Sequence, residues 1–161
     1  MVVVFDLDDT LYKEMDYLRS AYRYIACQLA AGDVEREEIY STLYGAYREG
    51  RDAFAVLLGN CRNAEFTKDT LLNWYRTHKP QISLCDGCRE FLSRLVAEGC
   101  RLGIITDGRT VTQTNKIVAL GLDRYIQDED IIISERFGSE KPSDGNYLHF
   151  MNKYGADARF Y

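Results

Sequence analysis

Residues 2–11 read VVVFDLDDTL and combine a short apolar run with three aspartates and a threonine. Four apolar residues are too few for a helix but suit a buried parallel strand, so the run predicts a strand over residues 2–5. Asp6, Asp8 and Asp9 follow at once. Carboxylates crowded at a strand end repel one another, so they indicate a bound cation or a nucleophile beside a proton-transferring group. In open α/β sheets, ligand sites lie at this end of the strands.

Two further apolar runs predict strands that also lead into polar residues. Arg101–Thr106 (RLGIIT) ends in a hydroxyl, and Asp107 and Gly108 follow it. Ile131–Ile133 is the third run, and the pair Lys141-Pro142 comes after a short loop. Helical patterns separate the later strands, and such alternation predicts a parallel sheet with right-handed crossovers. We therefore expect an α/β fold, a Rossmann-like three-layer sandwich.

In their order and spacing these residues resemble the motifs of the haloacid dehalogenase-like hydrolases, a superfamily made up mostly of phosphatases. Asp6, Asp8 and Thr10 match the first motif, DxDxT. Thr106 matches a Thr or Ser that ends the next core strand, and Lys141 matches a lysine that proline commonly follows. Each motif alone is a weak signal, but together they extend over nearly the whole chain.

The resemblance implies Mg²⁺-dependent hydrolysis of a phosphomonoester through an aspartyl-phosphate. Asp6 would be the nucleophile, and Asp8 the general acid and base, with a pKa raised by its negative neighbours. The Asp6 carboxylate and the Asp8 backbone carbonyl would bind Mg²⁺. Members of the superfamily that dehalogenate carbon substrates lack an acid at the Asp8 position, so this residue favours phosphate transfer.

The resemblance also implies how the phosphoryl group is held. Thr106 would bind it through its hydroxyl and Lys141 through its charge, and the lysine would pair with the nucleophile when no substrate is bound. Asp107 and Gly108 would add backbone N–H groups at the start of the following helix. The partner would be a small phosphorylated substrate, such as a nucleotide or a sugar phosphate. Asp9 stands where many relatives carry glycine, and we assign it no chemical step.

The stretch between the first two strands is too long for a simple crossover and is helical in pattern. Within it, Thr67 is typical of a helix N-cap. We predict a helical insert over residues 13–83, with residues 1–12 and 84–161 forming the core. The insert resembles the α-helical cap that many relatives carry after the first motif, which would exclude water and select the substrate.

A fourth motif of the superfamily, two acidic residues after one more core strand, is absent. Beyond a helix predicted over about residues 146–154, residues 157–161 look like the approach to that strand. We therefore expect a truncated core and poor activity for this chain alone. Two alternatives remain open: a non-catalytic phosphate-binding or regulatory domain, and a phosphomutase that uses the same aspartyl-phosphate.

The bulk properties narrow the classes of protein further. The 161 residues, 46% of them hydrophobic, suffice for one sizeable core with an insert. A net charge of −5 argues against general nucleic-acid binding. We expect no membrane span and no signal peptide, and so a cytoplasmic protein, which the odd number of five cysteines also fits. Cys85 and Cys88 form a CxxC without a second pair, which favours packing cysteines over a zinc site. The oligomeric state cannot be read from the sequence.

Overall fold

The computed structural model describes residues 1–61, 66–155 and 158–161. The chain forms two compact units. The sheet unit comprises Met1–Glu14 and Gln81–Tyr161, and the helical unit comprises Met15–Pro80. Among the helices of the described residues, none is long and apolar enough to cross a membrane.

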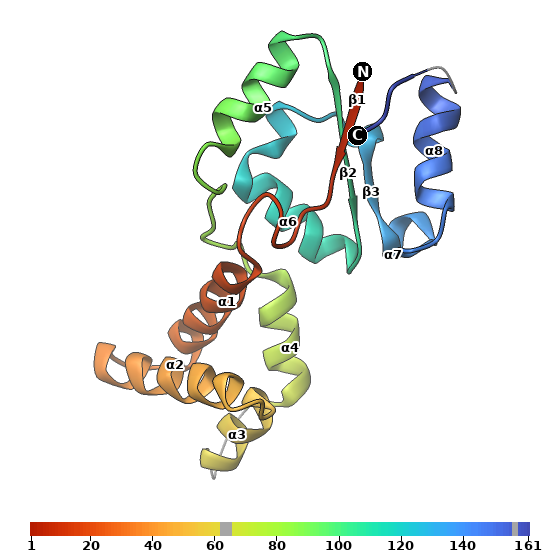
Figure 1. Ribbon diagram of the computed structural model, residues 1–161. Coiled ribbons are helices and arrows are strands. Elements are labelled where there is room, and N and C mark those ends of the chain that lie inside the picture. The colour runs from red at the N-terminus through yellow and green to blue at the C-terminus, as the bar shows by residue number, and fades with distance from the viewer. Residues whose placement is uncertain (62–65, 156–157) are drawn as a thin grey trace. The chain divides into compact units, whose positions relative to one another are not determined.

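Three parallel strands form the sheet in the order β1-β2-β3 (Figure 1). The strands are β1 (Val2–Phe5), β2 (Arg101–Thr106) and β3 (Ile131–Ile133). In the register of the sheet, Ile104 lies opposite Phe5 on one side and Ile131 on the other. The predicted strands and their parallel arrangement are confirmed. The carboxyl ends of β1 and β2 therefore lie side by side, and they carry the candidate site.

Helices cover both faces of this sheet. The helices α5 (Cys88–Ala97) and α6 (Thr110–Leu120) lie on one face, and α8 (Gly145–Tyr154) lies on the other (Figure 1). The connections include the short helix α7 (Ser134–Phe137) and two 3₁₀ turns, η1 (Leu122–Arg124) and η2 (Asp128–Asp130). Phe150 of α8 packs with buried side chains of all three strands, which are Val2, Ile105 and Ile132. The α/β three-layer sandwich is confirmed.

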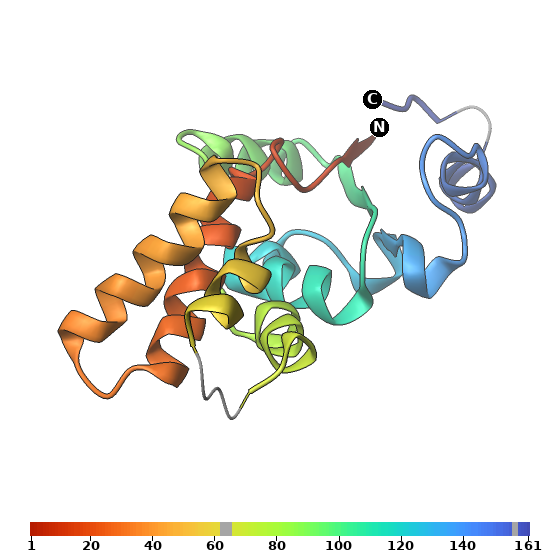
Figure 2. The same cartoon turned by 90° about the horizontal axis from the view of Figure 1, so that it is seen from below.

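The tail of the chain lies beside β1, on the edge opposite β2 (Figures 1 and 2). Val2 N–H donates to the Arg159 carbonyl at 2.9 Å, and Val4 N–H donates to the Tyr161 carbonyl at 2.8 Å. The bridge between Val2 and Phe160 is parallel. Residues 156–157, at the start of this tail, lie outside the described residues.

The helical unit has an apolar core of its own. Its helices are α1 (Glu14–Leu29), α2 (Asp33–Arg48), α3 (Ala53–Asn60) and α4 (Lys68–Thr77). All four contribute buried side chains to one cluster: Tyr22, Ile25, Leu43, Ala46, Ala53, Phe54, Leu57 and Leu71. Thr67 caps α4, because its hydroxyl accepts the Thr70 N–H at 3.2 Å. The predicted N-cap is confirmed.

Candidate active site

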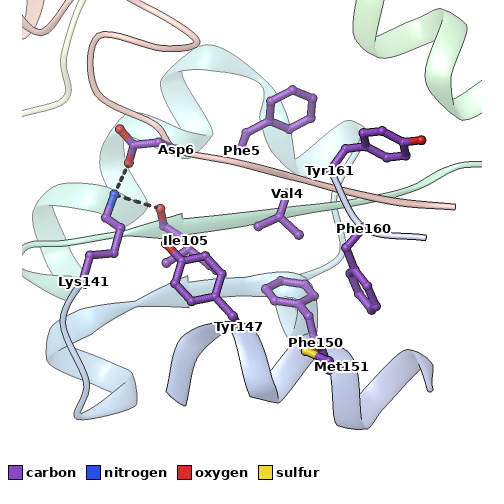
Figure 3. Close-up of a pocket in the computed structure, with 10 residues that line it drawn as sticks. All are labelled: Val4, Phe5, Asp6, Ile105, Lys141, Tyr147, Phe150, Met151, Phe160 and Tyr161. Atoms are coloured by element: carbon purple, nitrogen blue, oxygen red, sulfur yellow. Dashed lines mark hydrogen bonds and ion pairs between the residues drawn. The ribbon is translucent and has the colours of Figure 1, made fainter. Parts of the chain in front are cut away.

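Asp6 directly follows β1, and its carboxylate faces the ammonium group of Lys141 (Figure 3). Lys141 Nζ lies 2.5 Å from Asp6 Oδ1 and 3.5 Å from the carbonyl oxygen of Ile105 in the neighbouring strand. The Asp6 side chain is 41% exposed, so a ligand can reach its carboxylate. The predicted pairing of Asp6 with Lys141 is present.

The loop that carries Lys141 is tied to the end of β2. The backbone N–H of Lys141 donates to Oδ1 of Asp107 at 3.2 Å, and the Lys141–Pro142 peptide bond is cis. The side chain of Asp107 therefore anchors the lysine loop. The role of its backbone N–H toward phosphate stays a prediction.

The carboxylate of Asp8 is held by three other side chains. Lys116 Nζ lies 2.7 Å from Oδ1, and the Tyr12 hydroxyl also donates to Oδ1. Gln113 Nε2 donates to Oδ2 at 2.8 Å. The Lys116 side chain is only 5% exposed, against 23% for Asp8. Each of the two motif aspartates thus has a lysine of its own.

These contacts lower the pKa of Asp8. Burial raises the pKa of this carboxyl, but hydrogen bonds from Lys116, Tyr12 and Gln113 and the charge of Lys116 outweigh burial. The predicted rise is therefore wrong, because a buried cation touches the carboxylate directly. The repulsion from neighbouring carboxylates appears instead at Glu14, whose pKa is raised by its burial and then by Asp8.

Thr106 ends β2 with its side chain buried. Gln113 Nε2 donates to Thr106 Oγ1 at 2.6 Å and lies 3.2 Å from the Asp107 carbonyl oxygen. In the bond from Gln113 the Thr106 hydroxyl is the acceptor, so its proton is not used there. The amide of Gln113 therefore links Asp8 to Thr106 across the ends of β1 and β2.

Two backbone N–H groups around the start of α6 donate to side chains of α7. Gly108 N–H donates to Ser134 Oγ at 2.9 Å, and Thr110 N–H donates to Glu135 Oε2 at 2.7 Å. A phosphate at Gly108 would compete with Ser134 for this N–H. The assignment of Gly108 to phosphate binding stays a prediction.

Asp9 has a structural role in this loop. Its φ of 53° lies in the left-handed region, which glycine adopts readily and aspartate tolerates better than most residues. Its Oδ1 accepts the backbone N–H of Glu14, the first residue of α1, at 2.9 Å. The left-handed conformation is one that glycine would adopt without strain, and the hydrogen bond to Glu14 is what the aspartate side chain adds.

Sequence reasoning missed the three donors to Asp8, which are Tyr12, Gln113 and Lys116. A signal for two of them exists in the sequence. Gln113 and Lys116 lie three residues apart and so share a helix face, and that face also carries the buried residues Ile117 and Leu120. Polar side chains on a buried face need partners, so such a pair indicates a buried polar contact.

The oxygen ligands at the end of β1 suit a partly hydrated Mg²⁺ ion better than a metal ion enclosed by protein side chains alone. Within the described ranges, no group of three or more His, Cys, Asp and Glu side chains could hold a metal ion. Mg²⁺ takes oxygen ligands and usually keeps several waters beside one or two carboxylates and a substrate phosphate. The exposed Asp6 carboxylate and the backbone carbonyl of Asp8 fit that pattern, whereas the Asp8 carboxylate already has its partners.

A pocket of about 310 Å³ begins at the Asp6–Lys141 pair. Figure 3 shows the pair at one end and the aromatic tail residues Phe160 and Tyr161 at the other. Apart from the pair, the lining is largely apolar: Val4, Phe5, Ile105, Tyr147, Phe150, Met151, Phe160 and Tyr161. The positive charge that can bind a phosphate therefore lies at the end of the pocket formed by Lys141.

Comparison with known proteins agrees with this arrangement. The sequence profile of the haloacid dehalogenase-like hydrolases matches residues 3–159. The chain belongs to this family. Among curated relatives of this haloacid dehalogenase-like hydrolase are two glyceraldehyde 3-phosphate phosphatases. That of Methanocaldococcus jannaschii is 29% identical over 95% of this chain and 68% of its own length. That of Pyrococcus abyssi is 31% identical over 98% of this chain and 69% of its own length.

Solved structures show the same fold at lower identity. YfnB of Bacillus subtilis, described as a HAD-hydrolase bound to magnesium, has a TM-score of 0.59 and 19% identity over 98% of this chain and 73% of its own. The L-2-haloacid dehalogenase of Xanthobacter autotrophicus has a TM-score of 0.55 and 15% identity over 95% of this chain and 64% of its own. The predicted family and enzyme class, a hydrolase of the phosphatase type, are confirmed by the family match and the named relatives.

Proposed function

We propose that this haloacid dehalogenase-like hydrolase is a Mg²⁺-dependent phosphomonoesterase that acts through an aspartyl-phosphate on a small sugar phosphate. The observation that carries the proposal is the contact between Asp6 and Lys141 at the end of β1, with Asp8 two residues further along and separately held. The relatives named as glyceraldehyde 3-phosphate phosphatases make this triose phosphate the first substrate to test.

In the first step, an Asp6 carboxylate oxygen attacks phosphorus, and the bond from phosphorus to the substrate oxygen breaks. Asp8, which for this step must carry a proton although its donors lower its pKa, gives that proton to the leaving alkoxide, which departs as the alcohol. In the second step, water attacks the aspartyl-phosphate, and ionised Asp8 takes a proton from this water. Inorganic phosphate leaves, and the Asp6 carboxylate and the Asp8 proton are restored.

Residues at the ends of β1 and β2 and the lysine of the loop after α7 stabilise the charge of the transferring group. The Thr106 hydroxyl donates a hydrogen bond to a phosphoryl oxygen, and Lys141 neutralises part of the phosphoryl charge. The Asp6 carboxylate and the Asp8 backbone carbonyl would hold Mg²⁺, whose charge offsets the repulsion between Asp6 and phosphate. Asp107 contributes its backbone N–H.

Asp8 also favours phosphate transfer over dehalogenation, which the fold alone does not decide. Carbon dehalogenation has a halide leaving group that needs no proton, whereas a sugar alkoxide needs an acid at its oxygen. We further propose that residues 13–83 are a cap domain that selects the substrate and that residues 1–12 and 84–161 are the catalytic core.

Phosphate release from glyceraldehyde 3-phosphate and from p-nitrophenyl phosphate tests the proposal, with Mg²⁺ and with EDTA. We expect Mg²⁺-dependent release that Asp6→Asn abolishes, and a protein-bound phosphoryl group that hydroxylamine removes after acid quenching. Equal rates for wild type and Asp6→Asn would refute hydrolysis and favour a binding domain. Phosphate that moves between positions of one sugar without release would identify a mutase.

A further inference from the structure

Lys116 has no part in the proposed reaction, yet its ammonium group is buried against a reacting carboxylate. Its side chain is 5% exposed, and Nζ lies 2.7 Å from Asp8 Oδ1. Taking an ammonium group out of water is strongly unfavourable unless an opposite charge and hydrogen bonds compensate. The ion pair therefore fixes the positions of both side chains, Lys116 and Asp8.

Building on the proposed function, we propose that Lys116 and Gln113 are positioning residues that fix the direction of the Asp8 carboxylate for proton transfer to the leaving oxygen. They exchange no proton with the substrate and form no bond to it. The proton moves from Asp8 to the substrate oxygen as the bond from phosphorus to that oxygen breaks.

Both oxygens of Asp8 are fixed from different directions. Lys116 and the Tyr12 hydroxyl contact Oδ1, and Gln113 contacts Oδ2 at 2.8 Å. Contacts at both oxygens oppose rotation of the carboxylate about its terminal bond. Proton transfer needs the acid within hydrogen-bond reach of the accepting oxygen, and a displacement of about 1 Å can reduce the rate about 100-fold.

Gln113 also connects this carboxylate to the phosphoryl-binding side. Its amide nitrogen lies 2.6 Å from Thr106 Oγ1, so one side chain spans the proposed acid and a proposed phosphate donor. The loop after β2 packs closely on it, since a Cβ at Gly108 would lie 3.4 Å from two carbons of the Gln113 side chain. The Gln113 side chain is therefore confined by the packing of this loop as well as hydrogen-bonded through its amide nitrogen.

Two substrates with different leaving groups test this role. The kcat/KM value reports the steps up to departure of the leaving group, where the acid is needed for a sugar alkoxide but hardly for p-nitrophenolate. We expect Lys116→Met to lower kcat/KM about 10- to 100-fold for glyceraldehyde 3-phosphate and less than about threefold for p-nitrophenyl phosphate. Lys116→Arg, which keeps a cation beside Asp8, should recover part of the loss. Gln113→Leu should show the same substrate dependence.

A matched control is Lys153→Met in α8. Lys153 Nζ lies 2.6 Å from Oδ1 of Asp130, a carboxylate only 3% exposed, so this change also leaves a buried acid without its lysine. It should leave the ratio of the two kcat/KM values unchanged. Asp8→Asn combined with Lys116→Met should be no slower than Asp8→Asn alone, because the lysine acts through Asp8.

Equal losses on both substrates in Lys116→Met, or a double variant slower than Asp8→Asn, would overturn the inference. A wild-type protein without Asp6-dependent hydrolysis would instead refute the proposed function, so the two failures are distinguishable.

Discussion

The ring of Phe150 lies directly over the Cα of Gly103. A Cβ added at Gly103 would be 2.6 Å from Cε1 and Cζ of that ring and 3.2 Å from the carbonyl oxygen of Asp130. Glycine therefore allows α8 to approach β2. We expect Gly103→Ala to lower the free energy of unfolding by about 1–3 kcal/mol, measured by urea denaturation followed by circular dichroism.

Gly45→Ala serves as the control for this change. Gly45 lies within α2, and a Cβ there would meet nothing within 4 Å. Alanine should therefore stabilise the helix, by about 0.5–1 kcal/mol. A Gly103→Ala protein as stable as wild type would show that α8 does not press on the strand.

The strands could be predicted from the sequence, whereas the buried face of α8 could not. Arg101–Thr106 is an apolar run with a polar residue directly after it, so its bounds can be read locally. The buried residues of α8 are Asn146 and Phe150, while Tyr147 and Met151 are exposed. Hydrophobicity along a helix does not identify a buried asparagine, because only tertiary packing decides which side faces the sheet.

Asn146 gives a prediction of its own. It is fully buried, and within the described part of the chain neither its Oδ1 nor its Nδ2 has a hydrogen-bond partner. A buried polar group without a partner costs about 1–3 kcal/mol, so Asn146→Leu should raise the free energy of unfolding by a similar amount. Asn146→Asp should lower it, because a charge would be buried there. Thermal and urea unfolding measure both, and a destabilised leucine variant would contradict the missing partner.

The backbone conformation at Asp9 predicts an unusual order of stabilities. Both Asp9→Gly and Asp9→Ala lose the hydrogen bond to the Glu14 N–H, but only alanine is strained at a φ of 53°. We expect Asp9→Ala to be less stable than Asp9→Gly by about 1 kcal/mol, in urea unfolding at fixed pH. The reverse order would show that the loop does not hold this conformation.

His78 predicts how stability changes with pH. It is buried, its Nδ1 donates to the Tyr75 carbonyl oxygen at 2.9 Å, and Ser20 Oγ lies 3.2 Å from Nε2. Burial lowers the pKa of His78. In the unfolded chain a histidine has a pKa of about 6.5. Below that value the unfolded state binds a proton that the folded state does not, so this contribution to stability is complete above pH of about 6.5 and falls as the pH drops toward the folded pKa.

Fluorescence of Trp74, the chain's single tryptophan, follows this effect, because Trp74 lies in α4 of the helical unit. The free energy of unfolding should fall by at most about 1.4 kcal/mol per pH unit from this one proton as the pH drops below about 6.5. His78→Gln removes the titrating group and should flatten the dependence. An unchanged slope in that variant would assign the effect to other groups.

In the candidate site, too, the features that depend on neighbouring residues in the sequence could be predicted, whereas those that depend on tertiary contacts could not. Asp6 directly follows an apolar strand, Asp8 comes two residues later and Thr106 ends another apolar strand, so their positions alone indicate chemistry. The lowered pKa of Asp8 could not be predicted in this way. It depends on Lys116, which lies 108 residues away along the chain and reaches Asp8 only through the packing of α6 on the sheet.

Thr106→Val tests whether the buried hydroxyl binds the phosphoryl group or only supports Gln113. Valine keeps the branched shape, and the Gln113 amide retains Asp8 Oδ2 and the Asp107 carbonyl as acceptors, so unfolding should change by no more than about 1–2 kcal/mol. Loss of a donor to the transferring phosphoryl group should lower kcat/KM for p-nitrophenyl phosphate about 100-fold, and Thr106→Ser should stay within about threefold of wild type. A valine variant as fast as wild type would leave Thr106 with the structural role alone, and Lys141 would then be the one side chain assigned to the phosphoryl oxygens.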